Sequence, residues 1–160
     1  PNKIAASMFA PWYGTQWAYH GTSTIPGKGA IACGYFVTTV LRDSGLRINR
    51  VRLAQAASET MIRKLNGDKN IKRYRQKSIQ HFVKEVKKWG AGLYVVGLDY
   101  HTGFILNRNN KIYFIHSSIY PPTKVVNEKA ITSLALQNSN YRVLGKLFSS
   151  TQSIKYWLFN

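Results

Sequence analysis

Residues 92–116 read GLYVVGLDYHTGFILNRNNKIYFIH, and this stretch decides the fold class. It contains three runs rich in β-branched and aromatic residues, Gly92–Leu98, His101–Leu106 and Lys111–His116. Such runs are typical of strands, and the short polar connections between them join antiparallel neighbours. The sequence therefore predicts an antiparallel sheet in the C-terminal half of the chain.

Helical patterns come before this sheet. Apolar residues at helical spacing predict three helices, over Cys33–Ser44, Val51–Leu65 and Gln76–Trp89. Residues 1–31 are punctuated by Gly and Pro and form an irregular lead-in. A short helix around Glu128–Leu136 and two closing strands, Tyr141–Phe148 and Ser153–Phe159, complete the prediction.

This order of elements predicts one α+β domain over residues 1–160, with residues 33–90 helical and residues 92–160 mainly strands. The chain is 44% hydrophobic, enough for a real core. No apolar run approaches the roughly 20 residues that span a bilayer, so we predict no membrane span.

Composition also excludes several chemistries. With six acids spread along 160 residues, closely paired carboxylates are not expected, which weighs against a glycosidase and a carboxylate-bound metal. The single cysteine, Cys33, excludes an internal disulfide and a cysteine-based zinc site. We therefore predict no metal and no cofactor.

The net charge is strongly positive. The chain has 23 Lys and Arg against 6 Asp and Glu, a formal charge of +17 that favours anionic neighbours. The cations are densest in the segment 63–88, which we predict to contact a polyanion such as nucleic acid or a cell-wall polymer. The alternative is a solvated helix face.

Cys33 has the position of a nucleophile. It follows a Gly-rich approach and begins a predicted helix, whose dipole favours thiolate and is expected to lower the thiol pKa below about 8.5. Backbone N–H groups around Cys33, with Gly34 assigned to substrate binding, would stabilise an oxyanion. The alternative is that Cys33 is a small buried hydrophobe.

Two histidines stand at the ends of neighbouring predicted strands. If the turn between them closes symmetrically about Arg108 and Asn109, His101 and His116 are directly opposed on one face. One imidazole then acts as base while the other fixes its tautomer. A turn centred on Asn109 and Asn110 would place Ser118 opposite His101 instead. The alternative to catalysis is a pair of satisfied polar residues in a half-buried sheet.

Four segments together resemble the catalytic core of NlpC-like cysteine peptidases: Gly14–Thr22, Cys33–Val37, His101–Leu106 and Phe114–Ser118. The resemblance implies a papain-like fold and cleavage of amide bonds in peptidoglycan stem peptides or other peptides. It also implies a protein that is secreted or in the cell envelope of a bacterium, although no export signal is present in this chain.

By this resemblance Cys33 is the nucleophile, His101 the general base and His116 the orienting residue. Trp17 stands where the family places a substrate-pocket tyrosine, and Tyr19 is expected beside it in the groove. Ala32 departs from the family pattern, which has an Asp before the cysteine. These features predict a thiol-dependent amide hydrolase of altered substrate specificity.

Other functions remain open at this point. One is a catalytically inactive basic binding module on the same fold. A transglutaminase-like acyl transferase is a weaker resemblance, because that family has an Asp where this chain has His116. A nucleic-acid-binding protein is a third alternative.

Overall fold

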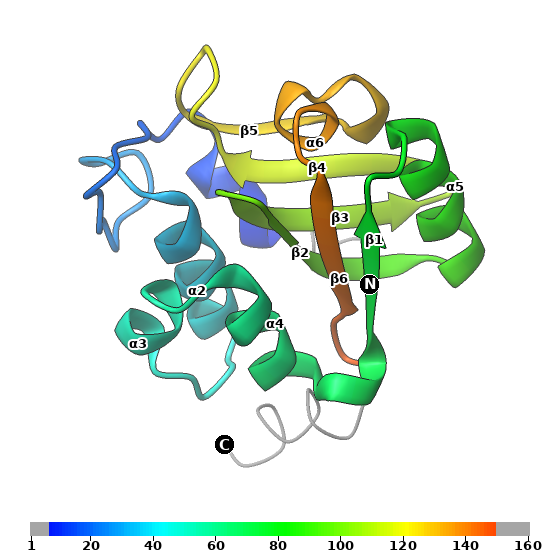
Figure 1. Ribbon diagram of the computed structural model, residues 1–160. Coiled ribbons are helices and arrows are strands. Elements are labelled where there is room, and N and C mark those ends of the chain that lie inside the picture. The colour runs from blue at the N-terminus through cyan, green and yellow to red at the C-terminus, as the bar shows by residue number, and fades with distance from the viewer. Residues whose placement is uncertain (1–6, 150–160) are drawn as a thin grey trace.

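A computed structural model describes residues 7–149, which form a single α+β domain, as predicted (Figure 1). The described residues contain the α-helices α2 (Cys33–Asp43), α3 (Arg50–Ala54), α4 (Ser58–Asn66), α5 (Ile79–Trp89) and α6 (Leu134–Gln137). The strands are β1 (Ile71–Arg75), β2 (Gly92–Leu98), β3 (Thr102–Arg108), β4 (Lys111–Ser117), β5 (Val125–Lys129) and β6 (Tyr141–Lys146). Short 3-10 turns lie at Ala10–Trp12, Asp68–Asn70 and Ala130–Thr132.

The strands form one antiparallel sheet in the order β1-β6-β2-β3-β4-β5. The three strands predicted from residues 92–116 lie next to one another in this sheet. The predicted strand Tyr141–Phe148 is confirmed as β6, while Ser153–Phe159 lies outside the described residues.

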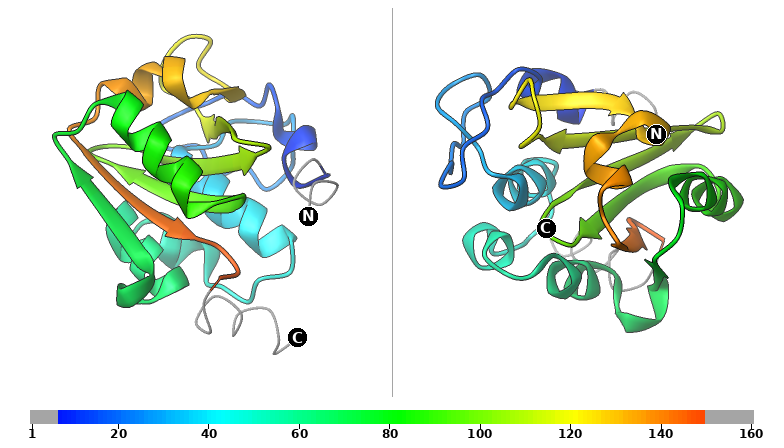
Figure 2. Two further views of the ribbon diagram at one scale, coloured as in Figure 1. Left: turned by 90° about the vertical axis from the view of Figure 1, so that its right-hand side faces the viewer. Right: turned by 45° about the horizontal axis from the view of Figure 1, so that its top comes forward.

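Helices cover both faces of the sheet, with α5 on one side and α2 to α4 on the other (Figure 2). One apolar core joins α2, α3 and α4 to sheet residues such as Phe104 and Ile115. The second core joins α5 and α6 to the opposite face, through residues such as Ile105 and Phe114. This alternation along β3 and β4 decides which side chains share a face of the sheet.

The helix that begins at Cys33 is confirmed. Phe36, Val37, Val40 and Leu41 are buried on its inner side, as the helical spacing predicts. Gly45 follows the helix with φ +107°, a left-handed conformation that a glycine adopts without the strain of a Cβ.

The predicted helix Val51–Leu65 is wrong as one element, because it divides into α3 and α4. At the end of α3, the carbonyl of Ala54 approaches α2 so closely that a Cβ on Gly34 would lie 2.6 Å from its oxygen. At the start of α4, Ser58 packs against Gly97 of β2 in the same way. A break lets each short helix pack on its own surface, which one straight helix would not allow.

Strand β1 replaces part of the region predicted to be helical. The segment Ile71–Arg75 reads IKRYR and pairs with β6 at the edge of the sheet. Its three cations interrupt the pattern of β-branched and aromatic residues by which a strand is predicted. Edge strands commonly carry such charges. The third helix therefore begins at Ile79 rather than Gln76, after Ser78, whose side chain accepts the N–H of His81.

The predicted helix Glu128–Leu136 is also largely wrong. Glu128 and Lys129 belong to β5, which pairs with β4, and only Leu134–Gln137 forms an α-helix. Ser133 caps this helix by accepting the N–H of Leu136. Glu128 therefore lies on a strand beside His116 rather than in a helix. Within residues 7–149, no helix combines the length and apolar character of a membrane span.

Candidate active site

Cys33 is the first residue of α2, and a network of backbone contacts fixes its approach. The N–H of Ala32 donates to the carbonyl of Gly21 at 2.9 Å, and the N–H of Ile31 donates to Gln16 at 2.8 Å. The lead-in loop is thereby tied to the segment that enters the helix. Cys33 is a free cysteine and is partly exposed.

The thiol is protonated at rest, contrary to the prediction of a lowered pKa. Burial raises the pKa of Cys33 above its ordinary value. Hydrogen bonds from the backbone of Thr102, Gly34 and Cys33 itself lower the pKa, but by less than burial raises it. The dipole at the start of α2 therefore does not produce a thiolate.

The prediction that the two histidines meet is confirmed. His101 Nε2 lies 2.7 Å from His116 Nδ1, with ring centroids 4.9 Å apart and ring planes at 78°. His116 is fully buried and stacks on Phe114, with ring centroids 3.9 Å apart.

The symmetric register predicted for this hairpin is wrong. Asn109 and Asn110 both have positive φ, at +53° and +58°, so they form the two-residue turn and Arg108 pairs with Lys111. The same register carried back along the strands would place Ser118 opposite His101. The histidines are therefore diagonal neighbours, two residues out of register but still on one face.

Gly103 makes this diagonal contact possible. A Cβ at this position would lie 2.8 Å from His116 Cβ and 2.5 Å from a ring carbon of Phe114. The absence of a side chain there leaves space between the two strands, and the ring of His101 reaches across it.

A carboxylate that the sequence prediction missed completes the chain of contacts. His116 Nε2 lies 2.8 Å from Glu128 Oε1, and Ser133 Oγ donates to the same oxygen at 2.7 Å. Burial works to raise the pKa of Glu128, but the hydrogen bonds from His116 and Ser133 prevail and lower it. Glu128 is therefore ionised at neutral pH and can only accept hydrogen bonds.

Glu128, the acceptor at one end of these hydrogen bonds, determines which nitrogen of each histidine carries a proton. Because Glu128 only accepts, His116 carries its proton on Nε2, and in a neutral ring its Nδ1 is then an acceptor. His101 must donate to that acceptor from its own Nε2. The remaining nitrogen of a neutral His101, Nδ1, is therefore unprotonated and has the character of a base.

Both imidazoles are neutral at rest. Burial, and secondly the proximity of His116, lower the pKa of His101 to about 3. Burial also lowers the pKa of His116, although the hydrogen bond and negative charge of Glu128 oppose this change. The site therefore holds a neutral thiol and neutral imidazoles with one fixed carboxylate.

The Cys33 thiol and the two imidazoles approach the same end of the sheet from opposite faces. Helix α2 packs on the face that contains Phe104, whereas the rings of His101 and His116 lie on the face that contains Phe114. The point of approach is Thr102, which follows His101 and whose backbone contacts the Cys33 thiol. Within the described residues, no hydrogen bond joins the thiol to an imidazole.

The other predicted site residues have different surroundings. Trp17 is half-buried, and its backbone N–H donates to the carbonyl of Thr123 at 3.0 Å. Tyr19 is 77% exposed and contacts the ring of His20 edge-on. Gly34 lies in the first turn of α2, where the approach of Ala54 excludes any side chain.

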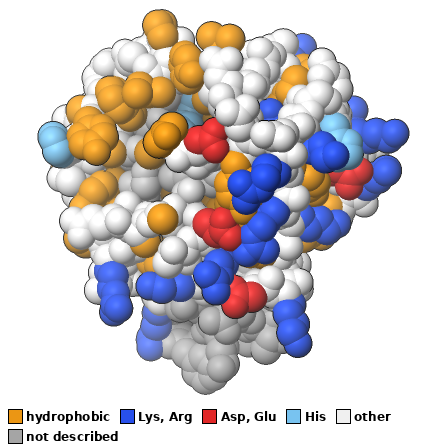
Figure 3. Space-filling view, in the orientation of Figure 1, with side chains coloured by type: hydrophobic (Ala, Val, Ile, Leu, Met, Phe, Trp, Pro, Cys, Tyr) orange, Lys and Arg blue, Asp and Glu red, His pale blue; other side chains and the backbone are white. Residues whose placement is uncertain are grey.

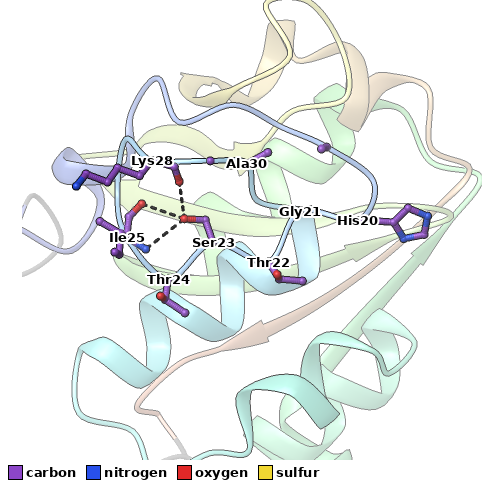
Figure 4. A pocket seen from close by; sticks show the side chains of 10 residues that line it. His20, Gly21, Thr22, Ser23, Thr24, Ile25, Lys28 and Ala30 are labelled. Carbon is purple, nitrogen blue, oxygen red and sulfur yellow. Dashed lines mark hydrogen bonds between the residues drawn. The ribbon is translucent and has the colours of Figure 1, made fainter.

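A shallow hollow of about 660 Å³ lies in the lead-in loop (Figure 4). Its lining runs from Ala18 to Ala30 and includes Lys28. The hydroxyl of Ser23 lies within hydrogen-bond distance of the carbonyls of Ile25 and Lys28 and donates its one proton to one of them at a time, which holds the loop closed. Gly21 belongs to both this hollow and the backbone contact with Ala32, so the hollow adjoins the approach to Cys33.

No group of three or more His, Cys, Asp or Glu side chains suited to a metal ion occurs in residues 7–149. No protein-family model, curated protein or solved structure matches this chain. The likeness to NlpC-like peptidases therefore remains a prediction from the residues themselves.

Proposed function

We propose that this protein is a thiol-dependent amide hydrolase, with Cys33 as nucleophile, His101 as general base and His116 as orienting residue. The observation that carries the proposal is the hydrogen-bonded chain from His101 through His116 to Glu128. In that chain His101 Nδ1 remains a basic nitrogen. His101 directly precedes Thr102, and the backbone of Thr102 contacts the Cys33 thiol. Nucleophile, base and orienting group are the parts that covalent acyl transfer needs.

In the proposed mechanism, the proton of the Cys33 thiol moves to His101 Nδ1 as the sulfur attacks the substrate carbonyl. Backbone N–H groups in the first turn of α2, at Cys33 and Gly34, stabilise the oxyanion. Collapse expels the amine, which takes the proton from His101. A water molecule then gives its proton to His101 and hydrolyses the thioester.

The resting protonation states favour general-base catalysis over a preformed ion pair. A raised thiol pKa and a lowered His101 pKa both oppose proton transfer before substrate binds. Catalytic hydrogen bonds that are long or absent in a free enzyme commonly tighten when substrate binds. The thiol–imidazole contact is therefore proposed to form in the substrate complex.

For the substrate, we propose an amide bond in a peptidoglycan stem peptide, on a papain-like fold of the NlpC type. This part of the proposal rests on the sequence resemblance, and it places the protein outside the cell or in the bacterial cell envelope. Trp17 and Tyr19, on the lead-in loop before α2, are the proposed groove residues. Ala32 supplies no carboxylate to hold a free amine, so a stem without a free terminal amine fits best.

Trapping the acyl-enzyme tests the proposal directly. The protein would be incubated with wall-derived stem peptides, quenched in acid and analysed by peptide mass spectrometry. We expect an acyl adduct on the peptide that contains Cys33, the only cysteine in the chain, and no turnover by Cys33→Ala. Turnover that survives Cys33→Ala would contradict the proposal, and an inert wild type under all these conditions would favour the inactive binding module.

We also propose that the basic segment 63–88 binds a polyanion. Lys and Arg side chains gather on the side of the molecule where β1 and α5 lie (Figure 3). The acids there are already paired, Glu59 with Arg73, Asp68 with Arg63 and Glu85 with Lys88. Exposed cations such as Lys77, Lys84 and Lys87 therefore add up to an uncompensated positive surface.

A charge-removal experiment with long-chain polyphosphate tests this surface. We expect the variant with Lys77, Lys84 and Lys87 replaced by Gln to bind at least about tenfold more weakly at low salt, because each cation contributes to counterion release. The matched control replaces Lys28, Lys111 and Lys129, three exposed lysines elsewhere on the surface. Equal losses in both variants would show a general charge effect and contradict a specific surface.

A further inference from the structure

Glu128 is not one of the predicted catalytic residues, but hydrogen bonds fix the position of its carboxylate. Its Oε1 accepts from both His116 Nε2 and Ser133 Oγ, at 2.8 and 2.7 Å. Ser133 is fully buried and also caps α6, so the hydroxyl has a fixed position. A carboxylate with two short contacts to buried partners is well placed to orient the ring beside it.

The register of the sheet explains how this contact forms. His116 pairs with Val126, and Phe114 pairs with Glu128, so the carboxylate is a diagonal neighbour of His116 on the same face. His101 is likewise a diagonal neighbour of His116 from the other side. The residue before β3 and the strands β4 and β5 thus carry one line of polar groups, His101, His116 and Glu128, that ends at the carboxylate.

We propose that Glu128 is a positioning residue that makes the two histidines a proton relay, so that the proton removed from Cys33 leaves its charge on His116 rather than on His101. This inference rests on the proposed function of Cys33 as nucleophile. It assigns Glu128 a role in the reaction although it contacts neither the substrate nor the sulfur.

The relay moves two protons and changes no other bond. The thiol proton passes to His101 Nδ1, and the proton on His101 Nε2 passes to His116 Nδ1. His101 ends neutral, with its proton on Nδ1, and is ready to protonate the leaving amine. His116 ends as an imidazolium whose Nε2 proton still donates to Glu128, and the sulfur has become a thiolate.

The position of the carboxylate explains why the charge comes to rest on His116. The imidazolium at His116 would contact Glu128 directly, whereas His101 has no carboxylate partner among the described residues. The charged or titratable groups that act on these three residues are the three themselves. An opposite charge at this distance commonly changes a pKa by about 1–3 units.

The resting tautomers provide the first test, and it needs no substrate. In ¹⁵N NMR spectra of the wild-type protein at neutral pH, we expect His101 and His116 each to carry a proton on Nε2 and none on Nδ1. A proton on Nδ1 of His116 would overturn the relay, because that nitrogen must be free to accept.

The second test measures kcat/KM for amide turnover across a pH series. Turnover needs one proton shared between Cys33 and His101, to be removed from the thiol and given to the leaving amine, so kcat/KM should have a plateau between the pKa values of base and thiol. In Glu128→Gln the amide oxygen still accepts from His116, but the negative charge is lost. We expect the plateau to fall at least about tenfold, and a rate within about twofold of wild type would overturn the relay.

Glu59→Gln is the matched control. Glu59 also accepts two hydrogen bonds, from Tyr141 and Arg73, but it lies on the surface at α4. We expect its kcat/KM for amide turnover to equal that of wild type, and a tenfold fall in this control would overturn the assignment to Glu128.

A milder variant keeps the test decisive if Glu128→Gln does not fold. Ser133→Ala removes one of the two donors that hold the Glu128 carboxylate beside His116, so we expect the plateau to fall, by less than in Glu128→Gln. An unchanged plateau would overturn the relay. Failure of the proposed function looks different, because amide turnover would then be absent while the expected tautomers of His101 and His116 persist in the NMR spectra.

Discussion

Replacing His101 by alanine is expected to lower kcat/KM for amide hydrolysis by about a thousandfold at neutral pH, within the range that a general base contributes. The reason is that the thiol of Cys33 is protonated at rest, and in the proposed mechanism His101 Nδ1 is the base that removes its proton. Without that base, the reaction depends on the small fraction of thiolate that bulk solvent produces. Steady-state kinetics across a pH series measure the loss.

The pH profile gives the same variant a distinct signature. His101 acts when unprotonated, and its pKa is lowered from the ordinary value to about 3. Wild-type activity should therefore persist as the pH falls through about 6.5, where an ordinary histidine would be half protonated, and should be lost only near pH 3–4. In His101→Ala the remaining activity should fall about tenfold for each unit below the thiol pKa.

His81→Ala is the control, since His81 lies on α5 and its N–H binds Ser78. We expect this variant to match wild type in rate and pH profile. A wild-type acid limit near pH 6.5, or a His101→Ala variant as active as wild type, would contradict the role of His101.

Replacing Gly103 by alanine is expected to separate the two histidines and to destabilise the fold by about 2–4 kcal/mol. The new Cβ would lie within 3 Å of both His116 Cβ and the ring of Phe114, both in the middle of the sheet. The strands must move apart to accommodate it, which breaks the contact of 2.7 Å between His101 and His116. Chemical denaturation measures the first effect, and imidazole NMR spectra measure the second.

Gly14→Ala is the matched control for an added methyl group. A Cβ at Gly14 would meet nothing within 4 Å, although its φ of +85° makes alanine cost about 1 kcal/mol there. We expect this variant to keep the wild-type histidine spectrum. An unchanged spectrum in Gly103→Ala would show that the glycine is not what permits the contact.

The central strands and α2 could be predicted because their signals are local. Residues 92–116 alternate strand-forming runs with short polar turns, and the apolar stripe of α2 ends at a glycine in a left-handed conformation. The split between α3 and α4 could not be predicted, because its cause is the packing of Ala54 on Gly34 and of Ser58 on Gly97. Those contacts join segments far apart in the sequence.

The meeting of the two histidines was predicted through a register that proved wrong. The turn at Asn109 and Asn110 moves the pairing by two residues, and a shift of two keeps every side chain on the same face. A shift of one residue would have placed His101 and His116 on opposite faces. The prediction that the two histidines share a face was therefore correct in spite of the wrong register, because side chains alternate between the faces of a strand with a period of two.

Glu128 was missed because its segment was predicted to be a helix. Val125 and Val126, immediately before Asn127 and Glu128, are a β-branched pair that could have indicated the strand. The thiol pKa was predicted in the wrong direction for a different reason. A sequence locates the helix dipole, but the burial that outweighs it comes from tertiary packing.

The central claim is that His101 takes the proton of Cys33, and the pH dependence of kcat/KM for amide turnover in wild type and in His101→Ala tests it most directly. We predict a wild-type value that is flat between about pH 5 and about pH 8 and a variant value that falls about tenfold per unit over the same range. Two superimposable curves, both falling tenfold per unit, would contradict it.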